Sequence, residues 1–235
     1  MPKEQYDISY KTYFNSRLKP VPFRGEEIFP IYVRMTFLRE TIFFKSYYFD
    51  LFTRPKYEFL KMSIPRVEKI EMETIGRIID RQTDHFDLNL FLREYRSLTP
   101  CLLDAFDEPF RRWLSSWLRN EGLPGLSNLA DEGNAEIAAI RLWDDLEKCL
   151  APAFLEKLRE AAIANAPAYI PLVTYVRHLS ANRPFCLPHL DWSQELTRNS
   201  IEDFFDETFG YMRVDFDKLL RDVRNILRRP PGISP

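Results

Sequence analysis

Hydrophobic and polar positions alternate along the first 52 residues in the manner of β-strands. Segment 6–17 sends Ile8 and Tyr10 to one side and Ser9 and Lys11 to the other, the two-residue period of a strand. Segments 29–38 and 41–52 are rich in Ile, Val, Thr, Tyr and Phe, which fit a pleated surface. A loop containing two prolines and a glycine separates the first strand from the second. The pattern predicts a small antiparallel three-stranded sheet.

The second and third strands are predicted to pair as a hairpin that turns at residues 39–40. In that register Phe37 lies opposite Ile42 on an apolar side, and Arg34 lies opposite Lys45 on the other side. The turn lacks the Asn-Gly pair that two-residue hairpins prefer, so the register stays open. A shift by an even number of residues keeps the two faces, whereas an odd shift exchanges them.

From Pro65 onward the apolar residues recur at helical spacing. Thr99-Pro100 is typical of a helix start, Gly122 of a helix end, and Ser200 to Asp203 of a capping box. The proline-rich stretch 167–188 is predicted to be extended, with a short strand at 172–176. The fold class is therefore α+β and mainly α: a small sheet at 1–60, a linker near 53–65 and a multi-helix domain at 66–235.

Composition limits the classes of protein. Hydrophobic residues make up 45% of the 235 residues and charged residues 29%, which excludes a disordered chain. No apolar run is long enough for a membrane span, and the first ten residues do not resemble a signal peptide. The 3 cysteines favour a cytoplasmic protein without a disulfide framework, and the 7 glycines argue against glycine-loop nucleotide enzymes.

The net charge of −2 hides an asymmetry along the chain. Residues 1–70 hold 13 Lys and Arg against 8 Asp and Glu, and the remainder is acidic. An anionic partner is therefore expected at the front of the molecule. The outward side of the predicted sheet carries Phe43 and the candidate nucleic-acid-binding residues, which are Lys11, Tyr13, Arg17, Tyr32, Arg34, Thr36, Lys45 and Tyr47.

Two properties of that side favour nucleic acid as the partner. Aromatic rings stand among the cations, and like charges opposed across strands destabilise a sheet unless an anion offsets them. Arg and Lys bind phosphates and guanine edges, and a ribbon of strands can enter the major groove. The alternative from the residues alone is a half-exposed sheet whose aromatic side chains are covered by the helical domain.

Segment 6–52 resembles the arm-type DNA-binding domain of tyrosine recombinases (integrases). The residues that carry the resemblance are Asp7-Ile-Ser-Tyr-Lys11, Gly25, Pro30-Ile-Tyr-Val-Arg34 and Phe44-Lys-Ser46. The resemblance implies a three-stranded sheet plus a helix lying in the major groove, with Arg34 and Lys45 as contacts. It covers about a fifth of the chain.

The rest of the chain departs from that family. His85, His178 and His189 are not followed three residues later by arginine, so the His-x-x-Arg step of the catalytic domain is missing. Strand cleavage is therefore not expected. The sequence predicts a DNA-binding accessory protein, of the kind found in mobile elements or phages, whose helical domain offers contacts to proteins or to a second copy.

Two other classes of function stay open. One is an interaction or structural protein whose aromatic sheet face packs on a partner, and the other is a metal-dependent nuclease without a recognised motif. A zinc site at Cys186 and His189 with His178 lacks a fourth ligand, and the acidic residues 202–207 fit a solvated helix face. Cys149 is expected in the core. No catalytic residue, metal ligand or cofactor is assigned.

Overall fold

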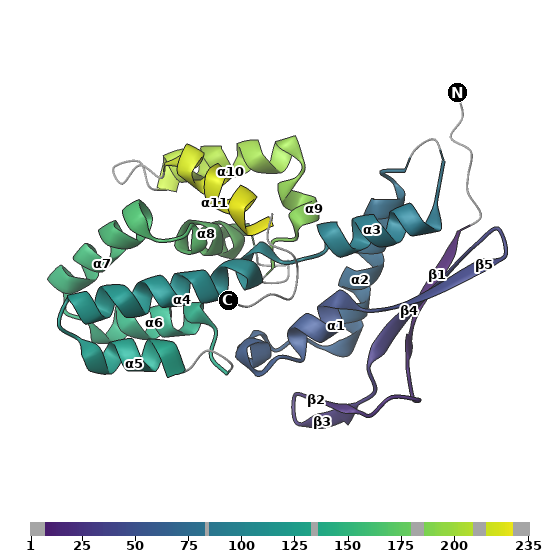
Figure 1. The fold of residues 1–235 in the computed structure, drawn as a ribbon, viewed down its shortest axis with the longest axis horizontal. Helices are drawn as coiled ribbons and strands as arrows, with labels where there is room; N and C mark the ends of the chain where they lie inside the picture. Colours follow the sequence, from purple (N-terminus) through teal and green to yellow (C-terminus); the bar gives the residue numbers. More distant parts are fainter. Residues whose placement is uncertain (1–7, 83–84, 133–135, 180–185, 209–214, 228–235) are drawn as a thin grey trace. The chain divides into compact units, whose positions relative to one another are not determined.

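The structure is a computed structural model, and it describes residues 8–82, 85–132, 136–179, 186–208 and 215–227 (Figure 1). The chain divides into two compact units, Met1–Pro100 and Cys101–Pro235. We call them the amino-terminal and the carboxy-terminal unit and describe each by itself. Together they make an α+β protein that is mainly α, as the sequence predicts.

The amino-terminal unit combines the sheet with its own helices. The strands are β1 (Ser9–Phe14), β2 (Val21–Phe23), β3 (Glu26–Ile28), β4 (Ile31–Phe37) and β5 (Glu40–Lys45). The helices are α1 (Tyr47–Phe52), the 3-10 helix η1 (Pro55–Leu60), α2 (Ile64–Ile79) and α3 (Leu88–Leu98). Strands β1, β4 and β5 form an antiparallel sheet in that order, and β2 pairs with β3 in a separate hairpin within the predicted loop.

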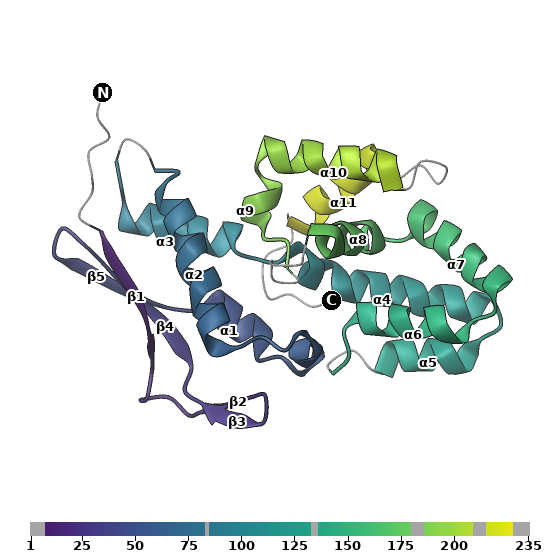
Figure 2. The same cartoon turned by 180° about the vertical axis from the view of Figure 1, so that it is seen from behind.

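Helices α2 and α3 cover one face of the three-stranded sheet, as the views from both sides show (Figures 1 and 2). Val33 and Met35 of β4 are fully buried on this inner face. The ring of Phe44 packs on Phe91 and Tyr95 of α3, with centroids 5.8 and 4.7 Å away. Burial of this face holds the sheet in place and leaves the opposite face to solvent.

The predicted faces of the hairpin are confirmed, but the predicted register is wrong by two residues. Met35 pairs with Ile42, and Arg34 pairs with Phe43 rather than Lys45. The turn residues are Leu38 and Arg39, with φ of 47° and 71°. Both therefore adopt the left-handed conformation that asparagine and glycine usually supply in this turn. Because the shift is even, the side chains of β4 and β5 keep their predicted faces.

The third strand ends earlier than predicted, because residues 47–52 form helix α1. Ser46 begins the helix by accepting a hydrogen bond from the Phe49 amide at 3.1 Å. The aromatic residues of this segment have strand propensity, but the helix buries Tyr48 and Phe49 in the core of the unit. Tertiary packing overrides local propensity here.

The carboxy-terminal unit is helical. Its helices are α4 (Leu102–Asn120), α5 (Pro124–Glu132), α6 (Ala139–Cys149), α7 (Pro152–Asn165), α8 (Tyr169–Leu179), α9 (His189–Trp192), α10 (Glu195–Thr208) and α11 (Phe216–Leu227). Helix α4 buries Phe106, Phe110 and Leu114. No helix in the described parts of the chain is long and apolar enough to cross a lipid bilayer.

Several local predictions for the helical residues are corrected. The predicted strand 172–176 lies in α8, because Pro171 occupies the first turn, where a missing N–H costs no helical hydrogen bond. Thr99 ends α3 instead of starting α4, and its hydroxyl donates to the Tyr95 carbonyl at 2.6 Å. Ser200 lies inside α10. Gly122 ends α4 with φ of 79°, as predicted.

The boundary between the two units falls after Pro100 in the chain, whereas the sequence places the linker near 53–65. Residues 53–65 belong to the amino-terminal unit, where η1 follows α1 directly. Helices α2 and α3 belong to the same unit because they supply the apolar surface that buries the inner face of the sheet. A three-stranded sheet without such a cover would leave Val33 and Met35 exposed.

Candidate nucleic-acid interface

The side of the sheet that faces away from α2 and α3 is built from nine residues, three from each strand. We call it the outer sheet face. The register arranges them in three cross-strand rows, which are Ser9–Thr36–Thr41, Lys11–Arg34–Phe43 and Tyr13–Tyr32–Lys45. All nine are exposed or half-exposed, and none is acidic. The face is therefore accessible in the amino-terminal unit and lacks negative charge.

The middle row carries two opposed positive charges. Lys11 on β1 is the direct cross-strand partner of Arg34 on β4. Both side chains are exposed, and neither has an ion-pair partner among the residues that the structure describes. Like charges placed opposite each other destabilise a sheet by about 0.2–1 kcal/mol. The repulsion expected from the sequence is thus present, but between Lys11 and Arg34 instead of Arg34 and Lys45.

An aromatic cluster lies beside these charges. Phe43 is 58% exposed and is the cross-strand neighbour of Arg34. Tyr13 packs edge-on against Phe43 with centroids 6.2 Å apart, and its ring lies 6.3 Å from that of Tyr32. A contiguous group of exposed or half-exposed rings, unlike a single exposed apolar side chain, is typical of a binding surface.

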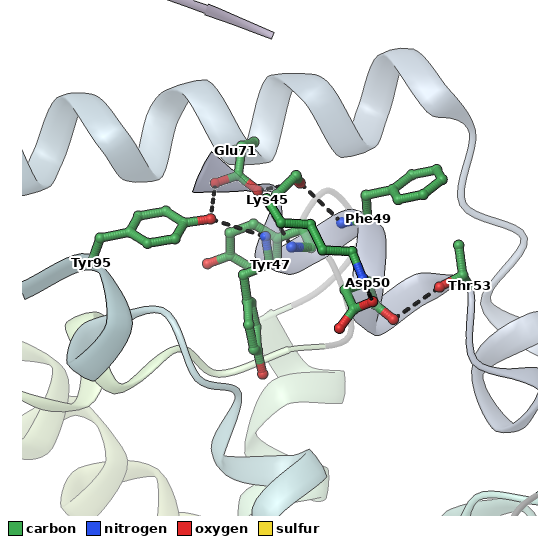
Figure 3. Close-up of polar contacts among 9 residues, drawn as sticks. Lys45, Tyr47, Phe49, Asp50, Thr53, Glu71 and Tyr95 are labelled. Carbon is green, nitrogen blue, oxygen red and sulfur yellow. Dashed lines mark hydrogen bonds and ion pairs between the residues drawn. The ribbon is translucent and has the colours of Figure 1, made fainter. Parts of the chain in front are cut away.

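Lys45 differs from the other two cations of the face. It ends β5, and its ammonium group makes an ion pair with Asp50 of α1 (Figure 3). Both side chains are about half exposed, so this pair contributes little to stability. Asp50 nevertheless reduces the net positive charge around Lys45. The positive potential of the outer sheet face is therefore strongest beside Lys11 and Arg34.

A buried carboxylate fixes the junction where β5 passes into α1. Glu71 of α2 is fully buried and accepts a hydrogen bond from the Ser46 hydroxyl. Its other oxygen accepts from the Tyr95 hydroxyl at 2.5 Å, and the Tyr95 oxygen in turn accepts from the Tyr47 amide at 2.9 Å (Figure 3). The Tyr48 amide also donates to Glu71, at 3.3 Å. One carboxylate thereby joins α2, α3 and the end of the sheet.

Burial raises the pKa of Glu71 above its usual value, and the hydrogen bonds from Ser46, Tyr95 and the backbone oppose that shift. The pKa of Tyr95 is raised well above its ordinary value, first by burial and then by the adjacent Glu71 carboxylate. Both pKa shifts arise because Glu71 and Tyr95 are buried away from water. This junction positions the end of β5, and it has no group exposed for chemistry.

The structure brings together six of the eight predicted site residues. Lys11, Tyr13, Tyr32, Arg34, Thr36 and Lys45 all lie on the outer sheet face. Arg17 follows β1 in an exposed turn, and Tyr47 begins α1, where it is half-buried against the Tyr48 ring.

Thr41 belongs to the same face, although it is not among the candidate residues that the sequence predicts. Its hydroxyl is 3.0 Å from that of Thr36. Thr41 lies two residues before Phe43 and four before Lys45 on β5, and this spacing alone predicts that the three side chains share one face.

The remaining chemical candidates do not form a site in the described residues. No group of three or more His, Cys, Asp or Glu side chains there could hold a metal ion. Cys186 is buried beside Cys101, and burial raises its thiol pKa well above the ordinary value. Cys149 is exposed, which corrects the prediction that it is a core residue. The acidic residues Glu202, Asp203, Asp206 and Glu207 are exposed on α10, as a solvated helix face requires.

Compared with models of protein families, with curated proteins and with solved structures, the chain gives no match. The resemblance of segment 6–52 to the arm-type domain therefore stays a prediction. The functional argument rests on the outer sheet face itself.

Proposed function

We propose that this protein binds duplex DNA through the outer sheet face and acts without catalysis. One observation carries the proposal: an exposed face of nine residues holds the opposed pair Lys11 and Arg34 beside an exposed Phe43, and it holds no acid. A polyanion offsets the repulsion between the two cations, because its negative charges and hydrogen-bond acceptors lie beside both of them. The role as an accessory protein of a mobile element or phage rests on the sequence resemblance alone.

The dimensions of the sheet suit the major groove. Neighbouring strands lie about 4.8 Å apart, so the axes of β1, β4 and β5 span about 10 Å. The major groove of B-form DNA is about 12 Å wide. A sheet that enters the groove with its strands along it places β4 over the base edges and the two edge strands beside the phosphates.

A salt titration tests the proposal. Binding of the full chain to a fluorescent duplex of about 20 base pairs is measured by anisotropy between about 50 and 200 mM salt. We expect saturable binding at the low end, with log K falling linearly against log salt because condensed counterions are released. Absence of binding at the lowest salt contradicts the proposal.

Exposed aromatic area favours a second candidate, a protein-interaction face. Phe43 is 58% exposed and Leu38 at the hairpin tip is 76% exposed. If these residues pack on a second copy, light scattering gives a dimer that Phe43→Ala converts to a monomer at any salt concentration. A DNA-binding face predicts instead that Phe43→Ala leaves the oligomeric state unchanged.

A further inference from the structure

We infer that Arg34 and Phe43 together read a guanine beside a thymine in the major groove. The inference rests on the proposed function and deepens it, because it separates the residues that choose a sequence from those that only hold DNA. Arg34 and Phe43 are direct cross-strand partners on β4 and β5. Paired side chains of this kind have Cβ atoms about 5 Å apart, so they meet the same or neighbouring base pairs, which are 3.4 Å apart along a strand.

Arg34 is the only cation among the three outer-face residues of the central strand, the others being Tyr32 and Thr36. A central strand faces the floor of the groove, where the base edges lie, since the edge strands occupy its two sides. Arginine binds the O6 and N7 atoms of guanine with two parallel hydrogen bonds, the commonest specific contact in protein–DNA complexes. Arg34 has no ion-pair partner in the described part of the chain that would compete for this contact.

Phe43 is placed to make an apolar contact with the methyl group of thymine. The 5-methyl group of thymine projects into the major groove, and phenylalanine is one of the side chains that contact it. Phe43 is 58% exposed next to Arg34, so it can bury that methyl group without any change in the inner face. Phe43 belongs to edge strand β5, but its ring packs edge-on against Tyr13 of the other edge strand, β1, with centroids 6.2 Å apart. Because β4 lies between these two strands, both rings reach over the central strand, which faces the base edges.

Lys11 provides the contrast on which the test depends. Like Arg34 it is exposed, and it lies directly opposite Arg34, but it belongs to edge strand β1. Its ammonium group is therefore placed for a backbone phosphate, which carries no sequence information. Replacing Lys11 weakens binding to all sequences alike, whereas replacing Arg34 or Phe43 changes the preferred base.

The experiment enriches bound duplexes from a pool with a randomised centre of about 10 base pairs, using the full chain and three variants. We expect the wild type to prefer a guanine next to a thymine. Arg34→Gln transfers the first preference from guanine to adenine, because glutamine pairs with adenine N6 and N7. Phe43→Ala loses the thymine preference, and Lys11→Gln keeps both preferences. A new adenine preference cannot arise from a misfolded protein.

Modified bases in the enriched duplex give a second readout. Replacing the thymine with deoxyuridine removes one methyl group and lowers wild-type affinity about fourfold, with no effect on Phe43→Ala. Replacing the guanine with 7-deazaguanine lowers wild-type affinity about tenfold, with no effect on Arg34→Gln. DNA binding without sequence preference, or with preferences that both variants retain, overturns the inference and leaves the proposed function standing. No binding to the pool at low salt overturns both.

Discussion

Replacing Glu71 with alanine lowers the free energy of unfolding by about 3 kcal/mol or more. The substitution removes the acceptor for the Ser46 and Tyr95 hydroxyls and the Tyr48 amide. A buried donor left without a partner costs about 1–3 kcal/mol. Urea unfolding of the full chain, followed by circular dichroism, measures the loss.

The variant Glu71→Gln separates the charge of this carboxyl group from its hydrogen bonds. The pKa of Glu71 is raised in the folded protein, mainly because the group is buried. Its stabilising contribution is therefore complete below the unfolded pKa near 4.5 and is lost as pH rises through the folded pKa. Glutamine does not ionise, so we expect the stability of Glu71→Gln relative to wild type to increase with pH across that window.

The prediction is tested by whether the stability of Glu71→Gln relative to wild type rises or falls with pH. Unfolding curves of both proteins are compared at several pH values above 4.5, so that other titrating groups cancel in the difference. A relative stability of Glu71→Gln that falls as pH rises means that the folded pKa of Glu71 is lowered, in contradiction to its burial.

The double variant Lys11→Thr, Arg34→Thr loses most of the electrostatic affinity for DNA. On a duplex of arbitrary sequence both cations act as phosphate partners, so the slope of log K against log salt becomes shallower by about 1.8. This corresponds to a loss on the order of a hundredfold at about 50 mM salt. Anisotropy titrations at several salt concentrations measure both quantities.

A matched control carries the same change in net charge away from the sheet. Lys69→Gln, Arg93→Gln removes one exposed lysine from α2 and one exposed arginine from α3. We expect its affinity and salt slope to stay close to those of the wild type. Equal losses in both double variants mean that only net charge attracts DNA and that the outer sheet face is not the site.

The same threonine variant is expected to fold more stably than the wild type. Lys11 and Arg34 repel each other across β1 and β4, and threonine suits a strand. The gain is about 0.2–1 kcal/mol in low salt and shrinks as salt screens the repulsion. A surface that costs stability and supports binding is typical of a functional site.

The fold class and the two faces of the sheet follow from the sequence because strand alternation is a strictly local pattern. Tyr32, Arg34 and Thr36 had to share one side of β4 whichever register the hairpin took. The amphipathic spacing of α2 and α4 is equally local and predicts helices there. Six of the predicted site residues therefore lie where the pattern places them.

The register and the end of β5 depend on contacts distant in the sequence. Leu38 and Arg39 have no local preference for the left-handed turn that they adopt, so the sequence predicts the turn one residue too late. Tyr47 to Phe52 form a helix because Ser46 caps it and α2 buries it, which residues 41–52 alone do not reveal.

The role of Glu71 was also hidden in the sequence. It lies between Val67 and Thr74 on the face of α2 that becomes buried. A single acidic residue on such a face is the one feature of the sequence that indicates a buried carboxyl group. Its partners Ser46 and Tyr95 are 25 and 24 residues away in the chain. Only the packing of three elements shows why a carboxylate is tolerated there.

Protection of lysine side chains from chemical modification tests most directly whether the outer sheet face binds DNA. The full chain is treated with an amine-reactive reagent with and without saturating duplex, and the modified lysines are identified by mass spectrometry. Lys69 and Lys148 have side chains that are 74% and 70% exposed and lie on helices, so they serve as internal references. If the outer sheet face holds the duplex, DNA lowers modification of Lys11 several-fold and leaves the references unchanged. Modification of Lys11 that is unaffected by saturating DNA contradicts a DNA-binding sheet.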